Sequence, residues 1–240
     1  MTARAGTVLC EWGMAGLVQL RERAAVIVVV DVLSFSTAVD VAVSRGAAVL
    51  PFASDDREAA RREAERRGAL LAEKRRPGGA GFSLSPGSLR ALQAGAMIVL
   101  PSPNGGRLSC AGNGVPMLAG CLRNAGAVAA AAREIAGATG TVAVIPAGER
   151  WTDGSLRPAI EDWLGAGAII AALDAPCVSE ARLASDSFRV AGSGVGALIW
   201  DCVSGRELCE RGFAEDVEIA LEQDVSGCVP VLRDAVYRRC

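Results

Sequence analysis

Five β-branched apolar residues, at positions 26–30, run without interruption into an acid, Asp31. An apolar run that does not alternate with polar residues indicates a strand buried on both faces, which is typical of a sheet with helices packed on each side. Two hydroxyl residues a little further on, Ser36 and Thr37, suit the cap of a helix that continues to Val43. We therefore expect a strand, a loop and a helix at the centre of an α/β protein.

Asp31 stands where open α/β sheets bind their ligands, at the carboxyl end of a strand and beside a helix N-terminus. A carboxylate at that point can hold a metal ion next to an anion that the helix N-terminus attracts. The same residue type also caps turns through hydrogen bonds to backbone N–H groups, without any part in chemistry. The residues of this stretch leave both interpretations open.

The chain has 240 residues, of which 51% are hydrophobic and 22% are charged, enough for a sizeable packed core. Its 28 glycines and an aromatic content of only 4% favour helices packed closely on a sheet over a β-sandwich. No repeat or linker divides the chain, so we expect a single domain over residues 1–240, with two tightly packed α/β subdomains as the alternative. A net charge of −2 gives no indication of nucleic acid as a partner.

The eight cysteines are scattered and form no C-x-x-C pair, so we expect reduced, mostly buried thiols rather than a disulfide framework. Charged residues at positions 11 and 21–23 interrupt the segment where a signal peptide needs an apolar core. The longest apolar run, near residues 165–173, is too short and too rich in glycine and alanine to span a bilayer. We expect a cytoplasmic protein with no membrane partner.

The sequence contains no histidine. A Ser-His-Asp or Cys-His nucleophile is therefore excluded, and so is the commonest protein ligand of zinc, copper and non-haem iron. Acid–base chemistry must then come from Asp, Glu, Cys, Lys, Tyr or water. A catalytic metal ion would have oxygen ligands, which favours Mg²⁺.

Two further apolar runs, at residues 96–100 and 141–145, are each followed by a polar loop and then by a helix-like segment. In a parallel sheet such loops converge on one edge, so we expect residues 31–37, 102–107 and 148–155 to lie together. The other expected elements are a short strand and turn in residues 1–23, a strand at 47–52, a charged surface helix at 55–67, a loop at 73–88, a short helix at 88–95, an alanine-rich helix within 121–135, helices at 158–173, within 179–212 and at 213–223, and a strand at 229–237.

The loop Asn104-Gly105-Gly106-Arg107 is the most suggestive of the three. Its glycines allow backbone N–H groups to point at an anion, and Arg107 can offer a forked cation to phosphate or sulfonate oxygens. Asn-Gly is also a common tight-turn dipeptide, so a plain turn is the alternative. The loop matches neither a P-loop nor G-x-G-x-x-G, which disfavours a dinucleotide-dependent enzyme.

Glu161 and Asp162 lie within an otherwise apolar predicted helix, and Glu149 and Asp153 lie in the loop before it. Together with Asp31 these acids could form a carboxylate set for Mg²⁺. Acids near a helix start are also favoured by the helix dipole alone. Because adjacent side chains cannot both face the core, we expect one of Glu161 and Asp162 to be solvated.

Four segments in order resemble the 2-phosphosulfolactate phosphatase family, the ComB-like phosphatases. The segments are V-V-V-D-V-L-S-F-S-T at residues 28–37, S-P-N-G-G-R at 102–107, A-G-E-R-W-T-D-G-S-L-R-P-A-I-E-D-W-L-G-A-G-A-I at 147–169 and G-F-A-E-D-V-E-I-A-L-E-Q-D-V-S-G-C-V-P-V-L at 212–232. The family reads D-V-L-R-A-(S/T)-T in the first and A-G-x-x-G-x-x-S-L-E-D-x-x-(C/A)-A-G in the third. The four segments extend through nearly the whole chain.

The resemblance implies an α/β fold with a mostly parallel or mixed sheet flanked by helices, and a homo-oligomer. It also implies Mg²⁺-dependent hydrolysis of a phosphate monoester on a small anionic acid, such as 2-phosphosulfolactate to sulfolactate. It places Asp31, Glu161 and Asp162 as catalytic and metal-binding residues, with Asp216 and Asp224 as later candidates. The expected substrate-binding residues are Ser36, Thr37, Ser102, Asn104, Gly105, Gly106 and Arg107.

The chain departs from the family pattern at three places. Ser34 stands where many relatives have arginine, Glu73-Lys74-Arg75 replaces G-E-R, and Gly106 replaces a hydroxyl residue. The first departure removes a cation that could bind an anion. It supports an alternative function, a non-catalytic protein that binds a small anion and has kept the phosphatase fold.

Overall fold

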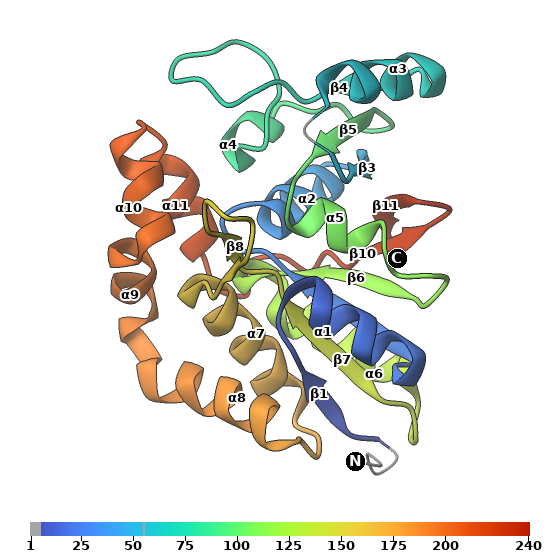
Figure 1. The fold of residues 1–240 in the computed structure, drawn as a ribbon, viewed down its shortest axis with the longest axis vertical. Coiled ribbons are helices and arrows are strands. Elements are labelled where there is room, and N and C mark those ends of the chain that lie inside the picture. Colours follow the sequence, from blue (N-terminus) through green and yellow to red (C-terminus); the bar gives the residue numbers. More distant parts are fainter. Residues whose placement is uncertain (1–5, 55) are drawn as a thin grey trace.

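The computed structural model describes residues 6–54 and 56–240, and it is an α/β structure with helices on both faces of one large mixed sheet (Figure 1). This confirms the predicted fold class. The nine strands that the described residues contribute to this sheet lie in the order β1 (Val8–Cys10), β7 (Val142–Pro146), β2 (Val26–Val30), β6 (Met117–Gly120), β10 (Pro230–Arg233), β11 (Val236–Arg239), β3 (Ala48–Phe52), β5 (Met97–Pro101) and β4 (Leu70–Leu71).

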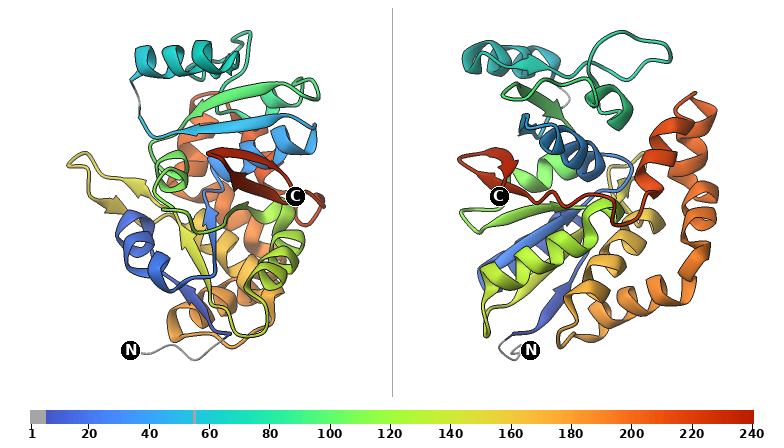
Figure 2. Two further views of the ribbon diagram at one scale, coloured as in Figure 1. Left: turned by 90° about the vertical axis from the view of Figure 1, so that its right-hand side faces the viewer. Right: turned by 180° about the vertical axis from the view of Figure 1, so that it is seen from behind.

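The sheet consists of two parallel blocks joined by an antiparallel hairpin. Strands β1, β7, β2 and β6 are parallel to one another, and so are β3, β5 and β4. The hairpin β10–β11 pairs antiparallel with β6 on one side and with β3 on the other. The second block therefore runs against the first. In the left view of Figure 2, β3 (light blue) and β5 (green) lie crosswise to β1 (dark blue) and β7 (yellow). The convergence of the three loops was predicted from a single parallel sheet, and the observed sheet is mixed instead.

Strand β2 is buried on both faces, as its apolar sequence predicts. Val26, Val28 and Val30 pack in one hydrophobic cluster with α6 (Ala125–Ala136) and α7 (Ile160–Leu173). Ile27 and Val29 belong to a second cluster, which includes α1 (Gly13–Leu20) and α5 (Gly105–Ser109). These two helical layers fix the level at which β2 ends and so the position of Asp31.

Helices also cover the second block of the sheet. Helix α2 (Phe35–Ser44) packs in a cluster with β3, β5 and β11, whereas α3 (Arg57–Arg67) contributes alanines to the cluster on β3 and β5. Asp56 caps α3 by accepting the N–H of Ala59, and the predicted first residue, Asp55, lies outside the described residues. The exposed face of α3 carries acid–base pairs such as Glu63–Arg66, as predicted for a surface helix.

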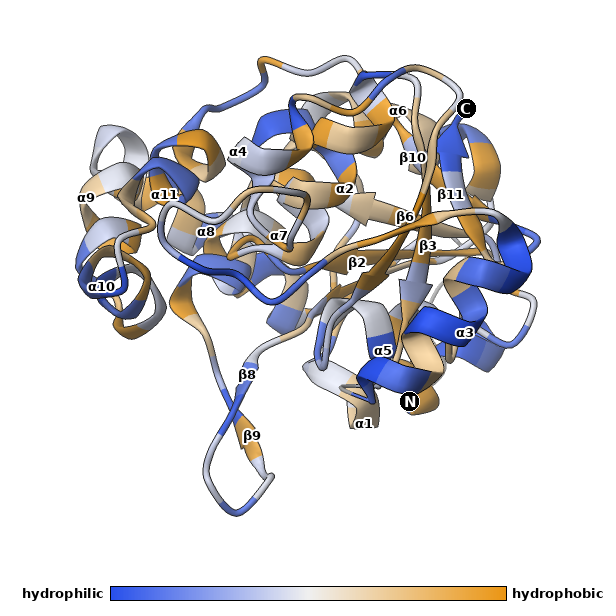
Figure 3. Ribbon diagram, turned by 90° about the horizontal axis from the view of Figure 1, so that it is seen from above, coloured by the Kyte–Doolittle hydropathy of each residue, from blue (hydrophilic) through white to orange (hydrophobic). Residues whose placement is uncertain are grey.

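The third quarter of the chain leads into an arc of helices along one side of the molecule (Figure 1). The arc consists of α8 (Ser179–Ala191), α9 (Val195–Asp201), α10 (Val203–Glu210) and α11 (Ala214–Leu221), which confirms the helices predicted there. Before it, β8 (Glu149–Arg150) and β9 (Leu156–Arg157) form a two-stranded hairpin that projects from the body (Figure 3).

Several elements differ from the prediction, and the two-residue strands β4, β8 and β9 were not predicted either. The predicted turn after β1 is helix α1, because Leu17 and Leu20 bury one side of it against the sheet. Strand β6 was not predicted, since its four residues contain no β-branched side chain and pairing on both edges creates it. The single strand expected at 229–237 is the hairpin β10–β11, which turns at Asp234 and Ala235 with positive φ. The short helix expected at 88–95 is α4 (Pro86–Leu89).

All eight cysteines are free, as predicted. Cys10, Cys121 and Cys228 are buried, but Cys110 and Cys240 are exposed, so the expectation of mostly buried thiols is only partly met. Among the described residues, no helix combines the length and the apolar character needed to cross a bilayer.

Candidate functional site

Asp31 joins the loops that follow two strands of opposite blocks. Its side chain is buried, and Oδ1 accepts the N–H of Phe35 at 3.0 Å while Oδ2 accepts the N–H of Gly105 at 2.8 Å. The first contact is the turn cap that one interpretation expected. The second brings the loop after β5 against the loop after β2, so these loops do meet although their strands run in opposite senses.

Ser36 and Thr37 hold the end of β2 rather than cap α2. Ser36 Oγ accepts the N–H of Asp31 at 3.1 Å and donates to the carbonyl of Val29 at 3.0 Å. Thr37 Oγ1 donates to the carbonyl of Val32 at 2.8 Å. Both side chains are fully buried, and their hydroxyl groups are engaged within this loop. Their role in substrate binding stays a prediction.

The two glycines of the Asn104–Arg107 loop permit close approach of the chain to Asp31. A Cβ atom on Gly105 would lie 2.4 Å from Phe35 Cδ1 and 2.8 Å from Asp31 Oδ2. A Cβ atom on Gly106 would lie 3.0 Å from the carbonyl oxygen of Phe52. The prediction was that backbone N–H groups of this loop point at an external anion. The N–H of Gly105 instead donates to Asp31 and is already engaged.

A cavity of ≈ 200 Å³ opens beside this loop, and Asn104, Arg107 and Glu149 line it. Asn104 Nδ2 donates to Glu149 Oε2 at 2.9 Å, whereas Ser102 is buried and accepts the N–H of Asn104. The side chain of Arg107 is exposed and makes no hydrogen bond or ion pair with another described residue. Its guanidinium group therefore remains available to an anion in the cavity.

Glu161 and Asp162 are both buried, at 2% and 3% exposure, so the expectation that one is solvated is wrong. Asp162 Oδ1 accepts the N–H of Val32 at 2.7 Å, and Oδ2 accepts the N–H of Gly148 at 2.9 Å. On the other side, Glu161 Oε2 accepts from Cys202 Sγ at 3.3 Å. The first turn of α7 is covered on two sides, which explains how adjacent acids can both be buried.

The electrostatics of the site are dominated by buried carboxylates. Burial, followed by the nearby charge of Glu149, raises the pKa of Asp31 to about 7. Burial, followed by the charges of Asp31 and Glu161, raises the pKa of Asp162 well above its ordinary value. The pKa of Glu149 is also raised, mainly by burial. These acids repel one another when ionised, and a cation would relieve that repulsion.

The donor chemistry of the site fits a hard cation such as Mg²⁺. Asp31, Glu161 and Asp162 offer oxygen atoms only, and Mg²⁺ in proteins is commonly held by one or two carboxylates together with water and substrate phosphate. Over residues 6–54 and 56–240, no three acidic or cysteine side chains gather in a way that could hold a metal ion unaided. Bound water and substrate oxygens would therefore have to complete the coordination.

Three further acids that the sequence suggested lie apart from Asp31. Asp153 is exposed in the β8–β9 turn, where it accepts hydrogen bonds from Ser155. Asp224 accepts the N–H of Gly126 at the start of α6. Asp216 is buried and faces Arg75, with 3.4 Å between Oδ2 and Nε.

Arg75 is a cation beside the site that the sequence analysis named only within the departure Glu73-Lys74-Arg75 and did not assign to the site. Its Nη2 donates to Ser34 Oγ at 2.9 Å and to the carbonyl of Leu84 at 2.8 Å, and its side chain is only 10% exposed. A guanidinium group from a distant segment thus lies against position 34, where resembling sequences have arginine. The run Glu73-Lys74-Arg75-Arg76 at the start of a glycine-rich loop was the available signal.

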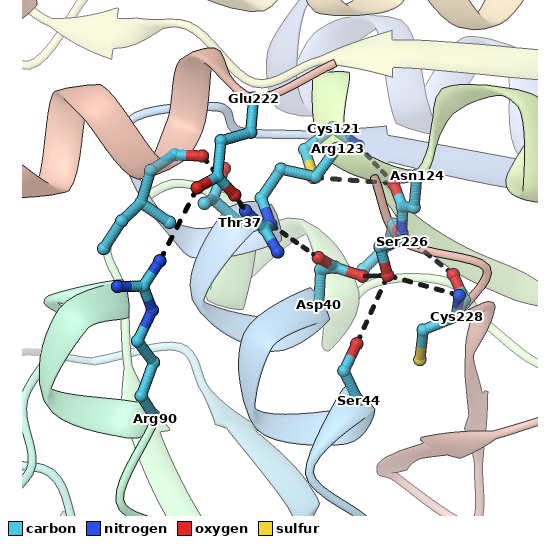
Figure 4. Close-up of polar contacts among 12 residues, drawn as sticks. Thr37, Asp40, Ser44, Arg90, Cys121, Arg123, Asn124, Glu222, Ser226 and Cys228 are labelled. Atoms are coloured by element: carbon cyan, nitrogen blue, oxygen red, sulfur yellow. Dashed lines mark hydrogen bonds and ion pairs between the residues drawn. The ribbon is translucent and has the colours of Figure 1, made fainter. Parts of the chain in front are cut away.

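Helix α2, which follows the Asp31 loop, is anchored from behind by a buried ion pair (Figure 4). Arg123 Nε lies 2.9 Å from Asp40 Oδ2, and Ser226 Oγ donates to Asp40 Oδ1 at 2.6 Å. Arg123 also pairs with Glu222, which lies 3.6 Å from Arg90. Asp40 is fully buried, and this network ties the helix to the C-terminal segment.

The fold and site together define an α/β protein in which buried carboxylates lie beside an exposed arginine, an arrangement suited to small anionic ligands. The sequence model of the 2-phosphosulpholactate phosphatase family matches residues 15–235. Over 217 residues, the chain is 36% identical to a 2-phosphosulfolactate phosphatase of Methanothermobacter thermautotrophicus, and the match covers 86% of each chain. The chain belongs to the 2-phosphosulfolactate phosphatase family and is thereby a hydrolase, which confirms the predicted resemblance.

Proposed function

We propose that the protein hydrolyses 2-phosphosulfolactate, the ester for which its archaeal relative is named, to sulfolactate and phosphate. The observation that supports this most is the meeting of three strand-end loops around Asp31. Hydrogen bonds from Gly105 to Asp31 and from Val32 and Gly148 to Asp162 join the loops after β2, β5 and β7. The exposed Arg107 adjoins them and lines a cavity of ≈ 200 Å³.

Arg107 and Asn104 bind and orient the ester in this proposal. The forked guanidinium of Arg107 matches two oxygens of a phosphate or sulfonate group, and Asn104 positions Glu149 at the same cavity. Asp31 provides the essential carboxylate, either as a ligand of Mg²⁺ or as the group that attacks phosphorus. Its two backbone hydrogen bonds fix the direction of that carboxylate before substrate arrives.

Mg²⁺ is the cofactor in this proposal, held by one or two of the carboxylates Asp31, Glu161 and Asp162 together with water and substrate oxygens. When bound, Mg²⁺ neutralises charge on the phosphate and orients the attacking oxygen. Oxygen-only donors and the raised pKa of both Asp31 and Asp162 support this choice. We also propose a cytoplasmic homo-oligomer, and sedimentation of the purified protein would measure the oligomeric state directly.

A non-catalytic protein that binds small anions is the second candidate. It is favoured by one observation, namely that both oxygens of Asp31 already accept backbone hydrogen bonds. The two candidates differ in turnover and not in binding.

A panel of phosphate esters, assayed with Mg²⁺ and again with EDTA, tests the proposal. We expect release of phosphate from 2-phosphosulfolactate with Mg²⁺, loss of that release in EDTA, and recovery when Mg²⁺ is restored. Full activity in EDTA would contradict the metal assignment. Binding of the esters without any turnover would establish the second candidate instead.

A further inference from the structure

A second, cationic pocket lies beside the candidate site. Its volume is ≈ 550 Å³, and it opens between the start of the 73–85 loop and the turn that joins α10 to α11. Figure 1 and the right view of Figure 2 both show this loop reaching toward α10 and α11. Four cationic side chains line it: Arg57, Lys74, Arg75 and Arg211. The acid among the lining residues is Glu73.

The positive charges of this pocket are only partly neutralised. Arg57 donates to Glu73 and to the carbonyl of Ala72, which accounts for one cation and the acid. Lys74 and Arg211 are exposed, and neither side chain makes a hydrogen bond or ion pair with another residue in the described part of the chain. The pocket therefore retains donors that an external anion can use.

Arg75 connects the pocket to the candidate site. It is one of the residues that line the pocket, and its Nη2 donates to Ser34, three residues after Asp31. Its buried Nε has no hydrogen-bond partner, although Asp216 Oδ2 lies 3.4 Å away. Burial lowers the pKa of Arg75, the charge of Asp216 raises it, and the charge of Arg211 lowers it. An anion between Arg75 and Arg211 would offset their mutual repulsion.

The pocket also adjoins the loop after β5. Pro101 and Pro103 form part of its wall, and between them lies Ser102, which accepts the N–H of Asn104. A ligand in this pocket would therefore lie against the 102–105 segment. The same segment contributes Asn104 to the wall of the smaller cavity, which Arg107 also lines. An ester with anionic groups at both ends could contact both regions.

We propose that this pocket is the subsite for the second anionic group of the substrate, the carboxylate or sulfonate that stays on the product. Arg211 and Lys74 bind that group, and Arg75 holds the subsite against the Asp31 loop. The inference rests on the proposed phosphatase function and specifies its substrate class as phosphate esters that carry a further anion. Guanidinium groups suit this task because their fork matches paired oxygen atoms.

The kinetic test compares Arg211→Gln and Lys74→Gln with a control, Arg76→Gln. Arg76 is exposed on the same loop but is not part of the wall of this pocket. Each variant is assayed with 2-phosphosulfolactate, with a phosphorylated hydroxy acid that lacks sulfonate, and with 4-nitrophenyl phosphate. For Arg211→Gln we expect KM to rise about 10- to 100-fold for an acidic ester, since one charge-assisted hydrogen-bonded contact is lost.

The expected pattern has three further parts. Values of kcat/KM for 4-nitrophenyl phosphate should stay within about 2-fold, because that ester has no second anion. The control should match the unaltered protein with every ester. A rise in KM for both acidic esters assigns the subsite to carboxylate, whereas a rise for the sulfonated ester alone assigns it to sulfonate. Equal effects on acidic esters and on 4-nitrophenyl phosphate, or no effect of Arg211→Gln and Lys74→Gln, would overturn the proposal.

A binding measurement keeps the test independent of turnover. Calorimetry with sulfolactate and with inorganic phosphate should show that Arg211→Gln weakens sulfolactate and leaves phosphate unchanged. If no ester is hydrolysed, the proposed function fails, and sulfolactate binding still decides the subsite. If the unaltered protein does not bind sulfolactate, or if Arg211→Gln binds it equally well, the subsite is refuted while phosphatase activity can stand.

Discussion

Two carboxylates connect the loops at the edge of the sheet. Asp31 accepts backbone N–H groups from Phe35 and Gly105, and Asp162 accepts them from Val32 and Gly148. Each acid thereby fixes its own direction and the distance between neighbouring loops. Buried acids of this kind are stable only when hydrogen bonds or cations compensate for lost water, so the side chains proposed for catalysis also hold the loops in place.

Gly105→Ala tests whether close packing at the loop controls the site. The added Cβ would lie 2.4 Å from Phe35 and 2.8 Å from Asp31 Oδ2, so the loop must move. We expect a loss of about 1–3 kcal/mol in the free energy of unfolding together with reduced kcat. Gly194→Ala is a matched control, because nothing lies within 4 Å of the added atom there. Denaturation and activity assays on both variants give the answer, and equal behaviour of the two would count against this role for Gly105.

Arg107→Lys tests the exposed cation at the smaller cavity. An ammonium group carries the same charge but cannot reproduce the guanidinium fork, so KM for the phosphate ester should rise about 10-fold. Arg62→Lys on the exposed face of α3 is the control and should leave KM unaltered. Steady-state kinetics measures both, and unchanged kinetics for Arg107→Lys would remove Arg107 from the site.

At the scale of elements, the buried pair of Asp40 and Arg123 holds α2 against the C-terminal segment (Figure 4). Arg123→Met removes the cation and leaves Asp40 buried without it, which should reduce the free energy of unfolding by about 3 kcal/mol. Arg90→Met is the control, since Arg90 is half exposed and its pair with Glu222 should contribute less than about 1 kcal/mol. Urea denaturation compares them. Equal losses in the two variants would show that the pair does not anchor α2.

Asp40 also predicts a pH dependence. Burial raises the pKa of Asp40 above 3.8, and hydrogen bonds from Ser226 and Arg123 offset only part of that rise. The folded protein therefore holds this proton more tightly than the unfolded chain, so the stabilising contribution is complete below pH 3.8 and is lost as pH rises through the folded pKa. Relative to Asp40→Asn, the Tm of the unaltered protein should fall as pH rises from 4. Parallel Tm profiles for the two proteins would contradict this.

Sequence patterns predicted those elements whose residues alone specify them. The run at residues 26–30 is buried on both faces, and the charged segment before Gly68 is a surface helix. Strand β6 was missed because its pairing with β2 and β10 specifies it, and not its local sequence pattern. Helix α1 was missed because the burial of Leu17 and Leu20 specifies it. Tertiary contacts override weak local preferences in short elements.

At the scale of the whole molecule, the sequence predicted which loops meet but not how. The loops at residues 31–37, 102–107 and 148–155 were expected at one edge of a parallel sheet. In the structure the second of them reaches Asp31 from the half of the sheet that runs in the opposite direction. Arg75 was not assigned to the site, because a loop far along the chain carries it to Ser34. Residues adjacent to strong strands could be predicted, and residues delivered by irregular loops could not.

The central claim is that Asp31 is required for chemistry, and the most direct test is turnover of 2-phosphosulfolactate with Mg²⁺ by the unaltered protein and by Asp31→Asn. Asn removes the charge, but its NH2 group replaces one carboxylate oxygen and so sets a donor against a backbone N–H donor. These two effects on stability oppose each other. Tm should change by no more than about 4 °C. Loss of kcat on the order of 10⁴-fold is predicted, by comparison with other catalytic carboxylates. Near-normal turnover in a folded Asp31→Asn variant would contradict the assignment.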